Sequence, residues 1–206
     1  MVIIAVRSYS IHIGLNKVDP ANYGGWEGVL SGCENDAGYY YDLALRLGFS
    51  HSVKMLSSAI AADALPTTDN IRKALRDISD MLEQGDYLFI TYSGHGGVVA
   101  DQNNDEDDWQ DETWCLYDRQ FIDDELWAEL SRFKKDVRIF LVSDSCHSGT
   151  IAKGIEKKAD EPVAPPPQVP VITYRMAPRE ITAAAYTRYR DVYLPFAKGP
   201  IINKAT

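Results

Sequence analysis

The chain of 206 residues is long enough for one well-packed domain and too short for two full ones. Apolar residues make up 45% and charged residues 25%, which is the balance of an ordinary globular protein. The formal net charge of −9 argues against binding to nucleic acid or anionic lipid, since both select for clustered Lys and Arg. We therefore expect neither nucleic acid nor a membrane as a partner.

The cysteine count and the N-terminal residues indicate the compartment. Cys33, Cys115 and Cys146 form an odd, sparse set, without the even number of a disulfide framework or the close spacing of a zinc site. The start of the chain is apolar for only about five residues, too short for a signal-peptide core, and no 18-residue apolar run follows. We expect a cytoplasmic protein with reduced thiols.

Apolar runs and helical spacings alternate along the chain. The pattern predicts a strand over Tyr9–Leu15, a helix over Cys33–Leu47 stopped by Gly48, and a short strand over Val53–Leu56. A second helix, capped by Thr68 or Asp69, continues through Leu82 to Gly85.

The alternation continues in the second half. It predicts a buried strand over Tyr87–Tyr92, a helix opened by Asp123 or Asp124 that runs over Leu126–Phe133, and a last clear strand over Val137–Val142. This order of strands and helices predicts the α/β class, with a mostly parallel central sheet covered by helices.

The pattern weakens after Gly149. Three consecutive prolines between Ala164 and Pro170 exclude helix and central strand, so this segment reads as an extended linker. One amphipathic helix is expected over Arg179–Leu194. We divide the chain into a catalytic domain of residues 1–158 and a proline-rich linker with a partly helical extension over residues 159–206.

Two predicted strands end in short, glycine-bearing loops that each carry one reactive side chain. They are Tyr92-Ser-Gly-His95-Gly-Gly97 and Ser143-Asp-Ser-Cys146-His-Ser-Gly149. Parallel sheets place their chemistry at the carboxyl ends of strands. A thiol needs a neighbouring imidazole to lose its proton and to protonate the leaving amine. Cys146 is therefore the candidate nucleophile and His95 its base, with the amides of Gly96 and Cys146 as oxyanion donors.

The structural alternative is that Cys146 is a small buried hydrophobe and His95 a satisfied structural histidine. His147 is a rival base, but it neighbours Cys146 in sequence and is expected to point elsewhere. We assign Cys33 and Cys115 to packing.

The two loops, about 50 residues apart and in this order, resemble the signature loops of metacaspases and bacterial orthocaspases. The stretch Gly32-Cys-Glu-Asn-Asp-Ala37 is similar to the loop and helix start after the first strand of that family. The segment Asp111-Glu-Thr-Trp-Cys-Leu-Tyr-Asp118 matches as well. The resemblance covers roughly Tyr9 to Thr150, the large-subunit portion. It implies a caspase-like three-layer α/β sandwich and cysteine endopeptidase activity.

The resemblance also implies cleavage after Arg or Lys. Asp36, Ser93 and Asp144 match the family's pocket residues, and a guanidinium in a partly desolvated pocket needs a carboxylate. The alternative is that Asp36 only meets the dipole of a helix start and that Asp144 caps the following turn.

An acidic run from Asp101 to Glu112 holds seven of the chain's 30 Asp and Glu. It is not an EF-hand, because Glu106 stands where that loop requires Gly. The resemblance maps calcium ligands onto Asp111, Asp123 and Asp124, but Lys153 stands where such enzymes carry an acidic ligand. We expect no required cofactor, with calcium at this trio as the alternative to a solvated acidic loop.

The family's fold continues into two further strands and a helix, the small-subunit portion, which nothing after Pro200 matches. We therefore expect a partner, either a C-terminal small-subunit portion or a second copy of the chain. A protease with basic specificity is also expected to process itself after one of the basic residues that follow Cys146: Lys153, Lys157, Lys158, Arg175 or Arg179. The competing function is a non-catalytic caspase-fold subunit that only binds such a partner.

Overall fold

The computed structural model describes residues 6–100, 110–145 and 175–196. Its centre is a four-stranded sheet in the order β2-β1-β3-β7, in which every neighbouring pair is parallel. The strands are β1 (Ser8–Gly14), β2 (His51–Leu56), β3 (Tyr87–Ser93) and β7 (Arg138–Asp144). They coincide with the four predicted strands to within a few residues.

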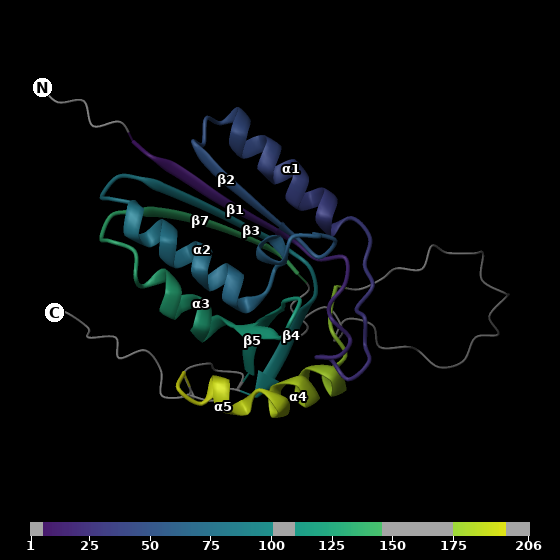
Figure 1. The fold of residues 1–206 in the computed structure, drawn as a ribbon. Helices are drawn as coiled ribbons and strands as arrows, with labels where there is room; N and C mark the ends of the chain where they lie inside the picture. The colour runs from purple at the N-terminus through teal and green to yellow at the C-terminus, as the bar shows by residue number, and fades with distance from the viewer. Residues whose placement is uncertain (1–5, 101–109, 146–174, 197–206) are drawn as a thin grey trace, which may run out of the picture.

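Helices cover both faces of this sheet, as Figure 1 shows, with α1 (Cys33–Arg46) on one side and α2 (Thr68–Met81) and α3 (Asp123–Leu130) on the other. The predicted α/β fold with a mostly parallel central sheet and a three-layer arrangement is therefore confirmed. The main core lies between the sheet and α2 and α3, and its fully buried members include Ile11, Ile13, Ile71, Leu75, Leu82, Leu88, Ile90 and Tyr92. A short 3-10 turn, Ala62–Ala64, precedes α2.

The starts of the helices explain how α1 and α2 are held. The Asn16 side chain, from the loop after β1, accepts a hydrogen bond from the Cys33 amide at 3.0 Å and so satisfies a free donor of the first turn of α1. The α2 cap is Thr67, whose hydroxyl accepts from the Asn70 amide at 3.3 Å, and not Thr68 or Asp69 as predicted. Extended backbone at Thr67 suits a cap.

A second, antiparallel sheet was not predicted. It joins β4 (Gly96–Ala100), β5 (Gln110–Cys115) and β6 (Gln120–Ile122) in the order β4-β5-β6. In the sequence, β4 starts in the loop that carries His95, and β5 starts within the acidic run from Asp101 to Glu112. These strands are only three to six residues long, and their pairing decides their conformation more than their own composition does.

The C-terminal segment packs onto this second sheet. The single helix predicted over Arg179–Leu194 is two helices, α4 (Arg179–Arg188) and α5 (Arg190–Tyr193), with a break at Tyr189. The Gln120 side-chain amide donates to the Thr182 carbonyl at 2.8 Å, and the Tyr193 hydroxyl donates to the Gln120 carbonyl at 3.0 Å. These contacts hold α4 and α5 against β6. The predicted boundary at residue 158 lies outside the described residues and stays a prediction.

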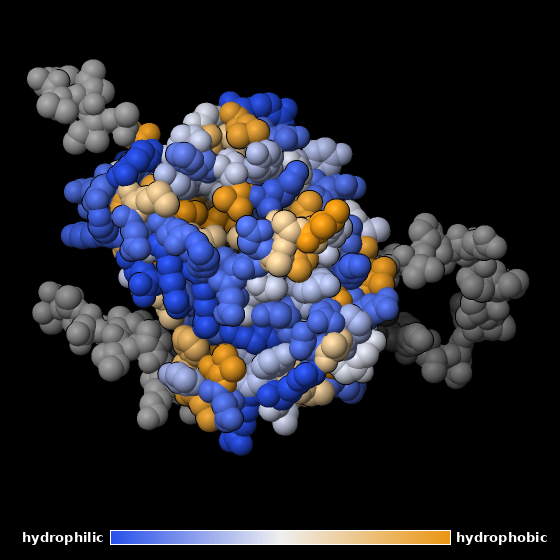
Figure 2. Space-filling model, in the orientation of Figure 1, coloured by the Kyte–Doolittle hydropathy of each residue, from blue (hydrophilic) through white to orange (hydrophobic). Residues whose placement is uncertain are grey.

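Hydrophilic side chains cover much of the surface over α2 and α3, with smaller hydrophobic patches elsewhere on the same face (Figure 2). Among the described residues, no helix combines the length and the apolar character needed to cross a bilayer.

Candidate active site

The two loops predicted to carry the chemistry start side by side at one rim of the central sheet. β3 and β7 are adjacent and parallel, with Ser93 opposite Asp144, so both strands end at the same level. The Gly94 amide donates to the Asp144 carbonyl at 3.4 Å and joins the two loops. Cys146 lies outside the described residues, two positions beyond the end of β7. The structure therefore shows where its loop starts.

Asp36, Ser93 and Asp144 meet at this rim, as the resemblance implies, and we call them the acidic pocket. Ser93 Oγ donates to Asp36 Oδ2 at 2.8 Å. Asp36 stands in the first turn of α1, so it lies at a helix start and in the pocket at once. The Glu34 carboxylate fixes this turn by accepting from the Ser58 amide at 2.8 Å. The pocket carboxylates thus come from two different elements.

The side chain of Arg175 occupies the acidic pocket. Its Nη2 donates to Asp36 Oδ2 at 2.8 Å, and its Nη1 donates to Ser93 Oγ at 2.9 Å and to the Asp144 carboxylate. The Arg175 side chain is 23% exposed, against 31% for Asp36 and 54% for Asp144. Burial disfavours its charge, but the hydrogen bond to Asp36 and the nearby Asp144 raise the pKa of the guanidinium. The pocket therefore binds a guanidinium within this chain.

The main chain of Arg175 is held as well. The Gly96 amide, predicted to be an oxyanion donor, donates to the Arg175 carbonyl at 2.9 Å. The Ala177 amide donates back to the Gly96 carbonyl at 2.9 Å, and Met176 forms a parallel bridge with Gly96. The backbone carbonyl of Arg175 is therefore hydrogen-bonded next to His95, while the side chain of Arg175 lies in the acidic pocket.

His95 is buried and held by a residue from the loop after β1. Its Nε2 lies 3.1 Å from the Gly28 carbonyl oxygen, and its ring packs against Trp26 with 4.7 Å between ring centroids. Since a carbonyl only accepts, Nε2 carries the proton of the neutral ring. Burial lowers the pKa of His95 to about 4, with a further decrease from the Arg175 charge and an opposing effect of the Gly28 and Arg175 carbonyls.

The second ring nitrogen, Nδ1, is buried and has no hydrogen-bond partner among the described residues. At neutral pH the ring is uncharged, so Nδ1 presents a lone pair. Gly28 has a φ of +56° and lies so close to the Trp26 and His95 rings that a side chain there would clash. This geometry leaves one basic nitrogen of His95 available to accept a proton.

The His95 loop is braced from the core. The Tyr92 ring stacks on Trp114 with 4.5 Å between centroids. Its hydroxyl donates to the His95 carbonyl at 2.7 Å. The Cys115 amide donates to the same carbonyl at 2.9 Å. A Cβ on Gly94 would lie 2.6 Å from the Tyr92 hydroxyl, so only glycine fits between strand and base. The backbone at His95 is thereby fixed.

With this geometry in place, comparison with known proteins decides the family. Residues 13–154 match the family model described as "Metacaspase, peptidase C14 domain". The chain belongs to the metacaspase family. It is similar to Metacaspase-6 of Arabidopsis thaliana, at 37% identity over 144 residues that cover 68% of this chain and 39% of that protein. It is also similar to Metacaspase-1 of Pyricularia oryzae, at 36% identity over 140 residues, 63% of this chain and 35% of that protein.

Among solved structures, this metacaspase-family chain resembles the crystal structure of protein GSU0716 from Geobacter sulfurreducens. The TM-score is 0.74 at 36% identity, and the match covers 94% of this chain and 66% of that one. The chain therefore spans between a third and two fifths of the length of these two curated metacaspases. The likeness confirms the predicted family and the caspase-like fold.

The two other cysteines are packing residues. Cys33 and Cys115 are free and fully buried. Burial raises the pKa of both thiols, that of Cys115 to about 12. A protonated buried thiol is a poor nucleophile, so neither Cys33 nor Cys115 is suited to that role.

The structure leaves the calcium prediction open. Among the described residues no group of three or more His, Cys, Asp or Glu could hold a metal ion. Asp123 and Asp124 begin α3, where the Asp124 amide donates to the Asp123 carboxylate at 2.9 Å. The side chain of Asp111 lies outside the described part of the chain. Calcium at this trio stays a prediction.

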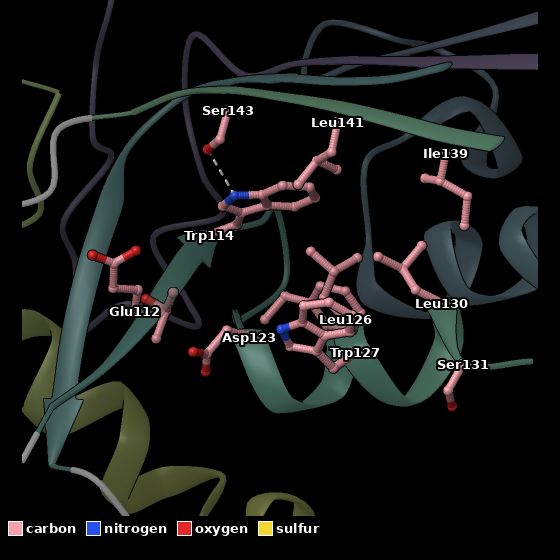
Figure 3. A pocket seen from close by; sticks show the side chains of 12 residues that line it. Glu112, Trp114, Asp123, Leu126, Trp127, Leu130, Ser131, Ile139, Leu141 and Ser143 are labelled. Atoms are coloured by element: carbon pink, nitrogen blue, oxygen red, sulfur yellow. Dashed lines mark hydrogen bonds between the residues drawn. The ribbon is translucent and has the colours of Figure 1, made fainter. Parts of the chain in front are cut away.

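A cavity of about 590 Å³ opens next to the site, between β7, β5 and α3. In Figure 3, Ile139 and Leu141 of β7 face Leu126, Trp127 and Leu130 of α3 across it. At the end nearest the catalytic loop, the Trp114 indole donates to Ser143 Oγ at 3.0 Å. This cavity runs along a strand that has no further neighbour among the described strands.

Sequence reasoning missed Gly28 and did not single out Arg175, although both contact the predicted site residues. Gly28, which orients His95, stands in a glycine-rich loop after β1. No reactive side chain in that loop indicates a functional role. Arg175 was only one of five basic residues after Cys146 that were expected as self-processing positions. The Arg175–Asp36 contact joins residues 139 positions apart, and the His95–Gly28 contact joins residues 67 apart. No local pattern reports such pairs.

Proposed function

We propose that this chain is the catalytic portion of a cysteine endopeptidase that cleaves after Arg or Lys, with Cys146 as the nucleophile and His95 as the base. The observation that carries the proposal is Arg175, which has its guanidinium in the acidic pocket and its carbonyl on the Gly96 amide. A substrate residue before a scissile bond needs these two contacts: a side-chain pocket and a donor for the developing oxyanion.

The charge of the acidic pocket supports the choice of substrate. Two carboxylates and the Ser93 hydroxyl surround a single cation, and their oxygens accept from separate guanidinium nitrogens. A lysine would place one ammonium among the same oxygens with fewer fixed contacts. An aspartate there would meet two like charges. We therefore expect Arg to be preferred over Lys, and Asp to be refused.

The geometry of His95 supports the direction of proton transfer. Nε2 is engaged by Gly28, so Nδ1 is the atom that takes the Cys146 thiol proton. The thiolate then attacks the carbonyl carbon of the residue in the acidic pocket, and the Gly96 amide stabilises the oxyanion. The C–N bond breaks as His95 protonates the leaving amine. Water, deprotonated by His95, hydrolyses the resulting thioester.

A partner for the β7 edge is part of the proposal. β7 is an edge strand among the described strands. Its Leu141, with Trp127 of α3, exposes apolar surface at the cavity, and its Phe140, stacked on Phe89, exposes apolar surface on the other face of the sheet. An open edge with apolar flanks favours pairing with a further strand. The small-subunit portion that the metacaspase resemblance implies is the occupant we propose.

The alternative function is a non-catalytic caspase-fold subunit that uses this same edge and cavity only to bind its partner. The exposed apolar surface at β7 favours it. Against it stands the acidic pocket, whose half-exposed carboxylates and adjacent His95 are unnecessary for strand pairing.

Hydrolysis of fluorogenic peptides tests the proposal, with Arg, Lys or Asp before the scissile bond. The chain is assayed alone and with the small-subunit portion of a relative added. We expect cleavage after Arg and Lys, no cleavage after Asp, and a loss of about 10²–10⁴-fold in His95→Ala. His51→Ala, an exposed histidine on β2, is the matched control and should cleave normally. No cleavage under any condition would favour the binding subunit. Activity that survives Cys146→Ala would mean that Cys146 is not the nucleophile.

A further inference from the structure

Trp114 of β5 contacts the ends of β3 and β7 at the same level. Tyr92 of β3 lies opposite Ser143 of β7 in the parallel register. The Trp114 ring stacks on the Tyr92 ring, with 4.5 Å between centroids and 5° between the ring planes. Its indole nitrogen donates to Ser143 Oγ at 3.0 Å, as Figure 3 shows. One side chain from the second sheet therefore bridges two neighbouring strands of the central sheet.

Each of these contacts continues into one of the two predicted catalytic loops. The Tyr92 hydroxyl donates to the carbonyl of His95, three positions further along the chain. Ser143 Oγ lies 3.1 Å from the hydroxyl oxygen of Ser145, in the loop after β7, so these two hydroxyls share a hydrogen bond. The ring face of Trp114 is thus linked to the loop after β3, and its N–H group is linked to the loop after β7.

The position of Trp114 is itself fixed by backbone pairing. β5 is the middle strand of the second sheet, and Trp114 lies opposite Gly96 of β4 and Phe121 of β6. The Trp114 residue is only 7% exposed. Side chains that position catalytic groups need rotamers locked by packing in this way. Trp114 is therefore a rigid support for both loops.

We propose that Trp114 is a positioning residue for the peptidase reaction, and that it holds the loops after β3 and β7 at a fixed separation through Tyr92 and Ser143. This inference rests on the proposed function. Trp114 transfers no proton itself, since the polar group of its side chain donates to Ser143. A displacement of about 1 Å between reacting groups can lower a rate by roughly 100-fold, so a support that links both loops affects the chemical step.

The acidic pocket lies on the other face of the central sheet. Successive side chains of a strand point to opposite faces. Tyr92 and Ser143 face Trp114, so the next pair along the strands, Ser93 and Asp144, faces α1. The binding of an arginine side chain therefore does not depend on the Trp114 contacts. Their loss should lower kcat for an Arg peptide and leave KM unchanged.

The alternative is that Trp114 only fills space in the core, to which it belongs. The hydroxyl of Ser143 would then be dispensable for catalysis. Threonine and valine have nearly the same shape, and only threonine keeps a hydroxyl. The variants Ser143→Thr and Ser143→Val therefore separate the hydrogen bond from the packing.

Steady-state hydrolysis of a fluorogenic Arg peptide tests the positioning role. We expect kcat to fall about tenfold in Ser143→Val and in Trp114→Phe, which keeps a ring but has no donor, while KM stays within about twofold. Ser143→Thr should keep the kcat of the wild type. Trp127→Phe, a change at an exposed tryptophan of the same cavity, is the control and should have no effect. Equal kcat in the Thr and Val variants would overturn the inference.

The double variant Trp114→Phe/Ser143→Val tests whether the two side chains act through one bond. Because both changes remove the same hydrogen bond, the double variant should lose about tenfold in kcat, and not the roughly 100-fold expected of independent changes. A 100-fold loss would show that Trp114 and Ser143 act separately, and the proposed bridge would then be wrong.

Hydrogen exchange tests the link without catalysis. The Gly94 amide donates to the Asp144 carbonyl at 3.4 Å, so it is protected while the two loops stay together. Its exchange should be about tenfold faster in Trp114→Phe and in Ser143→Val, and unchanged in Trp127→Phe. Unchanged exchange in all three variants would contradict the inference, and the peptidase would stand if the wild type cleaves Arg peptides. No cleavage by the wild type with the small-subunit portion present would instead overturn the proposed function, and the catalytic role of Trp114 with it.

Discussion

Two arginine–carboxylate clusters in this molecule differ in how they are closed. Arg119 meets Glu125 through two parallel hydrogen bonds of 2.8 Å, and the exposed fractions of the two side chains are 6% and 0%. Arg175 instead reaches two carboxylates on separate elements, which are 31% and 54% exposed. Glu125 also accepts from Arg72.

Under the proposed function, this difference distinguishes a structural contact from a substrate-binding site. The Arg119 cluster ties the turn before β6 to α3, and its Glu125 carboxylate is fully buried. The carboxylates around Arg175 are open enough to exchange one cation for another. A buried arginine therefore indicates a binding pocket only when the carboxylates that hold it remain accessible to solvent.

Removal of the buried carboxylate should produce the largest effect. Glu125→Ala leaves the buried charge of Arg119 without its partner and is expected to cost about 3–5 kcal/mol of unfolding free energy. Urea denaturation measures the loss. Glu83→Ala, which breaks the exposed pair with Lys134, is the control and should cost less than about 1 kcal/mol. Similar losses in both variants would remove the distinction between buried and open pairs.

Neutralising the acidic pocket should affect cleavage more than stability. Asp36→Asn removes a charge that holds the arginine, and a loss of about 2 kcal/mol corresponds to a roughly 30-fold lower kcat/KM for an Arg peptide. Asp144→Asn should lose less, because Asp144 is the more exposed carboxylate. Asp42→Asn, exposed on the same helix as Asp36, is the control. Unchanged cleavage in Asp36→Asn would place the specificity elsewhere.

A smaller effect is expected from pH. His12 is fully buried between Ser10 and Thr91, and burial, helped by the charge of Lys54, lowers its pKa from 6.5 to about 4. Between these values the unfolded chain binds a proton that the folded chain does not, so stability falls as pH falls from about 6.5 towards 4. Each such histidine contributes at most about 1.4 kcal/mol per pH unit.

Urea denaturation at pH 7 and pH 5 measures this dependence. His12→Gln should be less stable than the wild type at pH 7 but should lose less of its remaining stability on acidification. Equal losses in both proteins would mean that His12 does not titrate in this range.

The parts predicted from the sequence are those that local chemistry decides. β3 and β7 are apolar runs, and α1 and α2 have helical spacing with recognisable ends, so their positions follow from composition. The β4–β5–β6 sheet was missed because Gly96-Gly97 and the polar start of β5 acquire their conformation from pairing. The break at Tyr189 was missed for a similar reason, since packing around Gln120 turns the chain there.

The candidate site divides in the same way. His95, Gly96, Asp36, Ser93 and Asp144 were predicted from the loops in which they stand and from the metacaspase resemblance. Gly28 and Arg175 act through main-chain carbonyls and long-range contacts, which side-chain patterns do not reveal. The role of Cys146 stays a prediction, carried by its motif and by the strand end that precedes it.

The strand order of the central sheet has a consequence for what this scaffold can become. After β1 the chain leaves by α1 on one face, whereas β3 is approached from α2 on the other face (Figure 1). β1 and β3 are parallel neighbours with Gly14 opposite Ser93, so the loops that follow these two strands leave the sheet at the same rim. Gly28 stands in the loop after β1 and His95 in the loop after β3, and the Gly28 carbonyl oxygen lies 3.1 Å from His95 Nε2. Other reactive groups could therefore stand on these two loops without a change in the strand order that brings the loops together.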